Sequence, residues 1–178
     1  MEEWKSILQK YYAKYKKPFI VQKLFPFPHP WLEYPSPEYN EFVKEELCVS
    51  QRQVFFDEVV FDIDMIKTVH PITAKAEARK MAAEISSRLE ADKVSHEGFD
   101  SGGSGAHIHA FFPELLNYSK YDNWLLKRAI LKHYGAGMIR PRKWKGSVQL
   151  QQNTTIQIEY APHRKGSSKS LLFSRVYD

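Results

Sequence analysis

Two aspartates separated by one residue, Asp62 and Asp64, are the first candidates for chemistry in this sequence. They lie in the run VFFDEVVFDIDMI, residues 54–66, whose β-branched and aromatic residues and alternating second half predict a strand. On a strand both carboxylates project from one face, with Cα atoms about 6 to 7 Å apart. Such a pair can bind one hard divalent cation or a close pair of cations. The plainer interpretation of an isolated pair is a solvated strand end, but buried acids need a partner.

A glycine-rich segment, SGGSGAHIH, is the second candidate. Its glycines let a backbone approach a ligand closely, and successive free N–H groups in such a turn form an anion-binding concavity. His107 and His109 then share one face of the following strand. A tight hairpin would explain the glycines alone, whereas two histidines on one face directly after them favour a functional site. The residues concerned are Ser101, Gly102, Gly103, Ser104, Gly105 and His107.

A basic loop near the end of the chain, PHRKGSSK, is the third candidate. It contains His163, Arg164 and Lys165 between two β-like stretches. Cations in such a loop can oppose the charge of a nucleotide's phosphates. A solvated hairpin tip is an equally simple interpretation of the loop taken alone.

The charge of the chain is concentrated near its end. The 178 residues carry a net charge of +5 and have a pI of about 9.1. From Arg140 onward there are eight Lys and Arg residues against two acids, so that segment carries +6 and the first 139 residues carry −1. A concentrated positive segment is typical of phosphate binding, although a solvated face gives the same count.

The elements that must position these residues can be predicted from periodicity and turn signals. Apolar residues at helical spacing predict a first helix, and prolines between Pro26 and Pro37 predict a rigid connector. Pro71 can open a helix whose apolar face is Ala78, Ala82, Ile85 and Leu89. The remaining predictions are a short helix around residues 39–47, a β return over 98–112, a helix over 122–133, and β-like stretches at 147–160 and 170–176.

Composition and cysteine usage restrict the class of protein. Hydrophobic residues at 43% and charged residues at 26% are globular values. The single cysteine, Cys48, cannot form an internal disulfide or a zinc cluster that needs two thiolates. The opening residues show no secretory signal or membrane span, so we expect a soluble, intracellular, cytoplasmic protein with no membrane partner.

The order of the three segments resembles the archaeo-eukaryotic primase superfamily, which contains the small primase subunits and the primase-polymerases. The family pattern is a hydrophobic D-x-D or D-x-E, then S-G-x-x-G-x-H, then a third acid, then an H-x-K loop. VVFDIDM, SGGSGAHIH and APHRKGSSK match it in order over residues 54–176. The resemblance implies an α+β fold with an RRM-like sheet, one catalytic domain spanning residues 1–178, and a small N-terminal helical lobe over residues 1–53.

The resemblance also implies roles for individual residues. Asp62 and Asp64 would bind two catalytic Mg²⁺ or Mn²⁺ ions. The incoming nucleoside triphosphate would be held by Ser101, Gly102, Gly103, Ser104, Gly105, His107, His163, Arg164 and Lys165. The implied activity is that of a DNA-directed nucleotidyltransferase that makes or extends primers on single-stranded DNA in replication. Whether a helicase or a large primase subunit accompanies the protein is left open.

The chain departs from the family pattern at the third acid. Counting back from His163 leads to the neighbourhood of Ser147, where there is no carboxylate. Glu159 is the nearest acid and could substitute as a metal ligand. Two alternatives follow: a non-catalytic primase-like subunit that binds nucleotide or nucleic acid, and a metal-dependent hydrolase that uses His107 and His109 as ligands.

Overall fold

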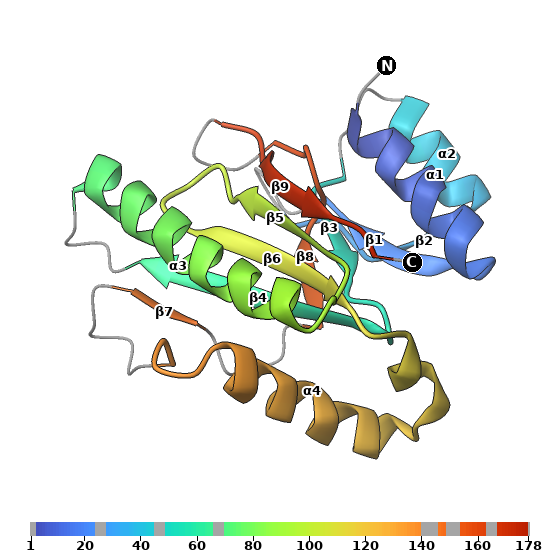
Figure 1. Ribbon diagram of the computed structural model, residues 1–178. Coiled ribbons are helices and arrows are strands. Elements are labelled where there is room, and N and C mark those ends of the chain that lie inside the picture. The colour runs from blue at the N-terminus through green and yellow to red at the C-terminus, as the bar shows by residue number, and fades with distance from the viewer. Residues whose placement is uncertain are drawn as a thin grey trace.

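The computed structural model describes residues 3–23, 28–44, 49–65, 70–139, 146–148, 154–162 and 167–177. These residues form two antiparallel sheets and four α-helices, so the fold is α+β, as predicted (Figure 1). The elements are α1 Glu3–Tyr15, β1 Phe19–Gln22, β2 Leu32–Tyr34, α2 Pro37–Lys44, β3 Gln51–Gln53, β4 Glu58–Met65, α3 Pro71–Ala91, β5 His96–Asp100, β6 Ala106–Phe111, the 3₁₀ helix η1 Pro113–Asn117, α4 Lys120–Tyr134, β7 Gly146–Val148, β8 Thr155–Gln157 and β9 Ser170–Arg175.

The larger sheet has the strand order β7-β4-β6-β5-β9 and carries two of the three candidate segments. One face of β4 is apolar, and Phe61 and Ile63 are fully buried there against α3 and α4. Burial of each such side chain stabilises the fold by about 1.5 to 3 kcal/mol. Because side chains alternate along a strand, Asp62 and Asp64 project from the opposite face.

Helix α3 confirms the prediction made from its apolar spacing. Pro71 occupies the first helical position, where a missing N–H costs no hydrogen bond. All four predicted residues of its apolar face are fully buried in the core: Ala78, Ala82, Ile85 and Leu89. The small alanines let the helix lie close to the sheet, and their steps of four and three residues keep them on one side.

The N-terminal region differs from the predicted helical lobe because it also contains a sheet. Helices α1 and α2 accompany a four-stranded sheet of order β2-β1-β3-β8, and a second core lies between them. In Figure 1, α1 and α2 lie together at one end of the molecule. The fourth strand, β8, comes from residues 155–157, and Gln51 pairs with Gln157. The boundary at residue 53 therefore stays a prediction, with this sheet crossing it.

Several predicted boundaries shift for physical reasons. The strand predicted over residues 54–66 begins at Glu58, because a turn separates it from β3. The β-like stretch predicted over 147–160 consists of two short strands, β7 and β8, in different sheets. The proline-rich segment contains β2, which is an edge strand, where missing N–H donors are tolerated. The short helix ends at Lys44, and residues 45–48 of the prediction lie outside the described residues.

The later elements follow their predictions closely. The helix predicted over residues 122–133 is α4, and the stretch at 170–176 is β9. The β return is the pair β5 and β6, joined by the glycine-rich segment. Among the described helices, none combines the length and hydropathy needed to cross a membrane.

Candidate nucleotide and metal site

The acid pair lies where β4 meets its two neighbours in the larger sheet. Asp62 is in register with His107 of β6, and Asp64 is in register with Ser147 of β7. The side chain of Asp62 is 20% exposed, and Asp64 is exposed. His107 Nε2 lies 3.4 Å from Asp62 Oδ1. The first two predicted motifs therefore meet on one face of the sheet.

The glycine turn, residues 101–105, joins β5 to β6 and is held by its own side chains. The N–H groups of Gly103 and Gly105 donate to Ser101 Oγ at 3.2 and 3.3 Å, and the Gly102 N–H donates to Asp100 Oδ1 at 3.1 Å. Gly102 has a φ of +78°, which favours glycine. These bonds fix the turn at the end of β5. The role of its residues in nucleotide binding stays a prediction.

Gly105 shows why the turn needs a glycine beside the acid strand. A Cβ built on Gly105 would lie 2.5 Å from the carbonyl oxygen of Ile63, which is backbone and cannot rotate away. The glycine thus permits the turn to approach β4 closely at Ile63, the residue between Asp62 and Asp64. Asp100, at the start of the turn, is paired with Lys75 and Arg79 of α3 at 3.1 and 3.0 Å.

The basic loop enters the same region through its stem. His163, Arg164 and Lys165 lie outside the described residues. The stem, residues 161–162 and 167–169, is described, and Pro162 forms an antiparallel bridge with Ser168. Ser167 Oγ donates a hydrogen bond to the carbonyl oxygen of Gly102. The end of the loop therefore lies next to the glycine turn.

Ser147 lies near the point of the sequence where the family pattern has its third acid, and the structure places it beside the acid pair. Its Cα is the register partner of Asp64 across the β4–β7 ladder. Directly opposed residues in an antiparallel pair have Cβ atoms about 4.5 to 5.5 Å apart. A serine at this position supplies no carboxylate to the pair.

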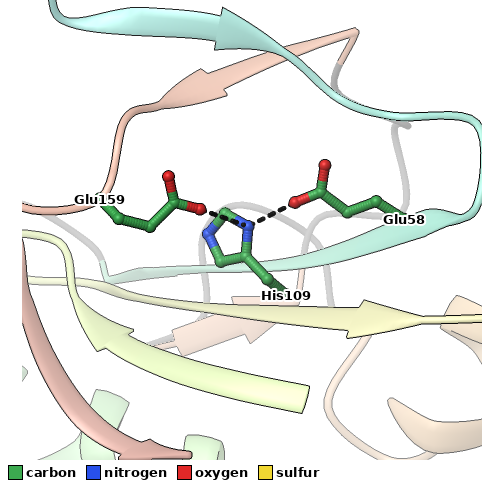
Figure 2. Close-up of side chains that lie close together, drawn as sticks. All are labelled: Glu58, His109 and Glu159. Atoms are coloured by element: carbon green, nitrogen blue, oxygen red, sulfur yellow. Dashed lines mark hydrogen bonds and ion pairs between the residues drawn. The ribbon is translucent and has the colours of Figure 1, made fainter. Parts of the chain in front are cut away.

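A second group of acids lies in the interior (Figure 2). Glu58 is on the same face of β4 as Asp62, and Glu159 follows β8. Glu58 and Glu159 are both fully buried. Arg52 donates to Glu58 through two nitrogens at 2.8 Å each, and to Glu159 Oε1 through Nη2 at 2.5 Å. Tyr11 donates to Glu159 at 3.0 Å. With His109 and Lys169, these residues form what we call the buried charge network.

The geometry of Glu58, His109 and Glu159 would suit a metal ion. Figure 2 shows both carboxylates directed toward the imidazole, and their donor atoms lie within 4.8 Å of one another. A metal ion could therefore bind here on grounds of distance. However, the guanidinium of Arg52 already bonds both carboxylates, and a second cation would be repelled by it. Among the described residues, Arg52 thus already supplies a cation to both carboxylates.

The pKa values in the network follow from this pairing. Burial is the largest single effect and would raise the pKa of Glu159, but Arg52 and the other nearby positive groups together outweigh it and lower the pKa to about 2. Burial also opposes the charged form of Glu58, and Arg52 again holds the pKa well below its usual range. For Lys169 burial is the larger effect and lowers the pKa to about 8. Two cations and two carboxylates thus balance at neutral pH if His109 is uncharged, and burial lowers the pKa of His109.

The hydrogen bonds of His109 define its tautomer. Lys169 Nζ lies 2.8 Å from Nε2, and because an ammonium can only donate, Nε2 accepts. Nδ1 then carries the proton and donates to Glu58 Oε1 at 2.6 Å, and Arg52 Nη2, 3.2 Å from Nδ1, donates to the two carboxylates instead. Both ring nitrogens are engaged, so His109 offers no nitrogen to an ion shared with His107. This argues against the metal-dependent hydrolase.

Glu159, the proposed substitute for the third acid, belongs to the buried charge network. Among the described residues, its carboxylate comes within metal-binding distance of Glu58 and His109, not of Asp62 and Asp64. The sequence pattern did not point to Arg52 or Glu58, and it placed Lys169 only in the basic loop, whereas Lys169 is buried and contacts His109. The only signal was alternation: Glu58 lies four residues before Asp62 and therefore on the same face of the strand.

The fold, and the position of the acid pair beside the glycine turn, can be compared with those of known proteins. No model of a protein family and no curated protein matches the sequence. Among solved structures, the polymerase domain of Mycobacterium tuberculosis Ligase D, solved in complex with DNA, is similar, with a TM-score of 0.52. The likeness covers 88% of this chain and 75% of that one at 14% sequence identity. The chain therefore shares the fold of this polymerase domain, which supports the resemblance found in the motifs.

Proposed function

We propose that this chain is a primase-polymerase that adds nucleotides to a primer on single-stranded DNA, with residues 1–178 acting as one catalytic domain. The observation that carries the proposal is the register of β4 with β6, which brings Asp62 beside His107. The stem of the basic loop adjoins the glycine turn through Ser167. Three segments far apart in the sequence thus adjoin one small region, as a shared nucleotide ligand would require.

The donor set of the acid pair suits Mg²⁺ or Mn²⁺. Asp62 and Asp64 offer only oxygen, lie on one face and are accessible to solvent, unlike Glu58 and Glu159. When bound, such ions activate the primer 3′-hydroxyl and stabilise the leaving pyrophosphate. We assign the pair to Mg²⁺ or Mn²⁺ on this chemistry.

The remaining residues would hold the substrates. His107, with Nε2 close to Asp62, is suited to contact a phosphate oxygen next to the acid pair. Ser101 and the rest of the glycine turn shape the neighbouring backbone, and the loop with His163, Arg164 and Lys165 would supply cations to the triphosphate. The charge of +6 after residue 139 suits a DNA template, and the similar polymerase domain was solved with DNA.

The test is primer extension with a defined template, deoxynucleotides or ribonucleotides, and Mg²⁺ or Mn²⁺. We expect the wild-type protein to lengthen the primer and release pyrophosphate, and D62N and D64N each to reduce the rate by at least about 100-fold, the scale of a lost electrostatic contact in a reaction centre. E77Q, which neutralises an exposed acid on α3, is the matched control. Extension that persists in D62N and D64N would reject the proposal.

A second candidate, a non-catalytic subunit that binds nucleotide or nucleic acid, is favoured by one observation. Ser147 stands in register with Asp64 and brings no third carboxylate to the pair. This candidate predicts salt-sensitive binding of single-stranded DNA, with no pyrophosphate release at any metal concentration. Pyrophosphate that appears only with template and metal together would decide for the enzyme.

A further inference from the structure

One face of α4 carries flat side chains at helical spacing. Tyr121, Trp124 and Arg128 follow one another at steps of three and four residues, so they form a row along the helix. The rings of Tyr121 and Trp124 are stacked, with centroids 6.4 Å apart and planes at 23°. The guanidinium carbon of Arg128 lies 4.8 Å from the centroid of the Trp124 ring. We call this row of planar groups the α4 ladder.

The α4 ladder is open to solvent, and the core does not require it. Tyr121 is 69% exposed and Trp124 is 42% exposed. The helix packs against β4, α3 and η1 through its other side, whose buried residues are Asn123, Lys127, Leu131 and Tyr134. Figure 1 shows α4 on the side of the molecule opposite α1 and α2. Large aromatic side chains that are exposed together in this way mark an interaction surface.

The charges next to the α4 ladder are mainly positive. Lys120 precedes it, Arg128 belongs to it, and Lys132 follows one turn later, all on α4. Asp122 adds one negative charge at the helix start, where its carboxylate accepts a hydrogen bond from Ser119 Oγ at 2.6 Å. The surface therefore combines flat rings with a cationic end.

We propose that the α4 ladder binds single-stranded nucleic acid, with bases stacked on Tyr121 and Trp124 and phosphates paired with Arg128 and Lys132. Every nucleotide of a single strand brings both a flat ring and a negative charge, which are the two features that this surface complements. A protein partner would need acids and aromatic or aliphatic groups in matching order. The inference rests on the proposed function only in taking the strand to be the template.

The α4 ladder and the acid pair lie on opposite faces of the larger sheet. Helix α4 packs in the core beneath Phe61, whereas Asp62 projects from the other face. A strand must therefore pass around the sheet to contact both sites.

The test measures binding of a fluorescent oligo(dT) of about 20 nucleotides by anisotropy, with an abasic strand of the same length as a second probe. We expect the double variant Y121A/W124A to bind oligo(dT) about tenfold more weakly, with little change for the abasic strand. W124F keeps an aromatic ring for stacking, so it should retain most of the affinity for oligo(dT). The matched control is W31A, because Trp31 is also 42% exposed and lies just before β2.

Two outcomes would overturn the proposal. One is equal affinity of Y121A/W124A and W31A for oligo(dT). The other is a protein assembly, seen by light scattering without DNA, that Y121A/W124A abolishes while oligo(dT) binding is unchanged, which would assign the surface to a protein partner. Failure of the proposed function is a separate outcome, because it would be seen as absent primer extension. A loss of oligo(dT) binding in Y121A/W124A would still support the inference in that case.

Discussion

Strand β4 carries acids of two kinds on one face, and their surroundings differ. Glu58 is buried, and both it and Glu159 are paired with Arg52, while Lys169 supplies the second positive charge. Asp62, four residues on and about 13 Å along the strand, is partly exposed and lies beside an imidazole. Where solvent is excluded, the chain supplies its own cation, because a buried carboxylate without one is too costly. Where solvent reaches, the acids are accessible to an external cation.

The largest effect that separates the two regions is expected at Arg52. The substitution R52M leaves Glu58 and Glu159 buried without their cation and should lower the free energy of unfolding by about 3 to 5 kcal/mol. Urea unfolding followed by circular dichroism measures this. R175M, which removes an exposed pair with Glu90, is the control and should change stability by at most about 1 kcal/mol. A small effect of R52M would mean that the interior acids do not depend on this guanidinium.

The next effect is a dependence of stability on pH. Because the pKa of Glu159 is about 2 in the folded chain and near 4.5 when unfolded, its pairing stabilises the fold above pH 4.5. This contribution, on the order of 3 kcal/mol, is lost as the pH falls from about 5 toward 2. The free energy of unfolding, measured across this range, should decrease less steeply with falling pH in E159Q than in the wild type. Equal slopes would contradict the pairing.

The smallest effect concerns the exposed region. The substitution S147D adds a carboxylate in register with Asp64 and should raise the affinity for Mn²⁺ by about fivefold, since charge count tunes such sites. Calorimetric titration with Mn²⁺ measures this, and S147N serves as the control for size. If S147D leaves the Mn²⁺ affinity unchanged while D62N abolishes binding, the pair binds its ion without help from β7.

Much of the larger sheet could be predicted from the sequence, because its signals are local. Alternation about Asp62 gave the strand and its polar face, Pro71 and the alanine spacing gave α3, and the histidine strand followed from the turn. The smaller sheet could not be predicted in this way. Its strands are three or four residues long, too short for a period to stand out, and β8 pairs with a strand far away in sequence.

The candidate site shows the same division. Asp62 and His107 could be placed on polar faces of two strands, and their register supports the prediction that they share a region. The partner of Glu159 could not be predicted, because Arg52 is distant in sequence and only tertiary packing brings the two together. An acid near the end of the chain has the same sequence signal whether it faces a metal or an arginine.

The pairing of β3 with β8 has a consequence for the order of assembly. Gln51 and Gln157 are joined across more than a hundred residues, so this contact can form only after all the intervening residues have left the ribosome. Until then Arg52 and Glu58 are present without Glu159, and the smaller sheet lacks its fourth strand. Residues 155–169 therefore complete the smaller sheet, the interior ion pairs and the contact with the glycine turn.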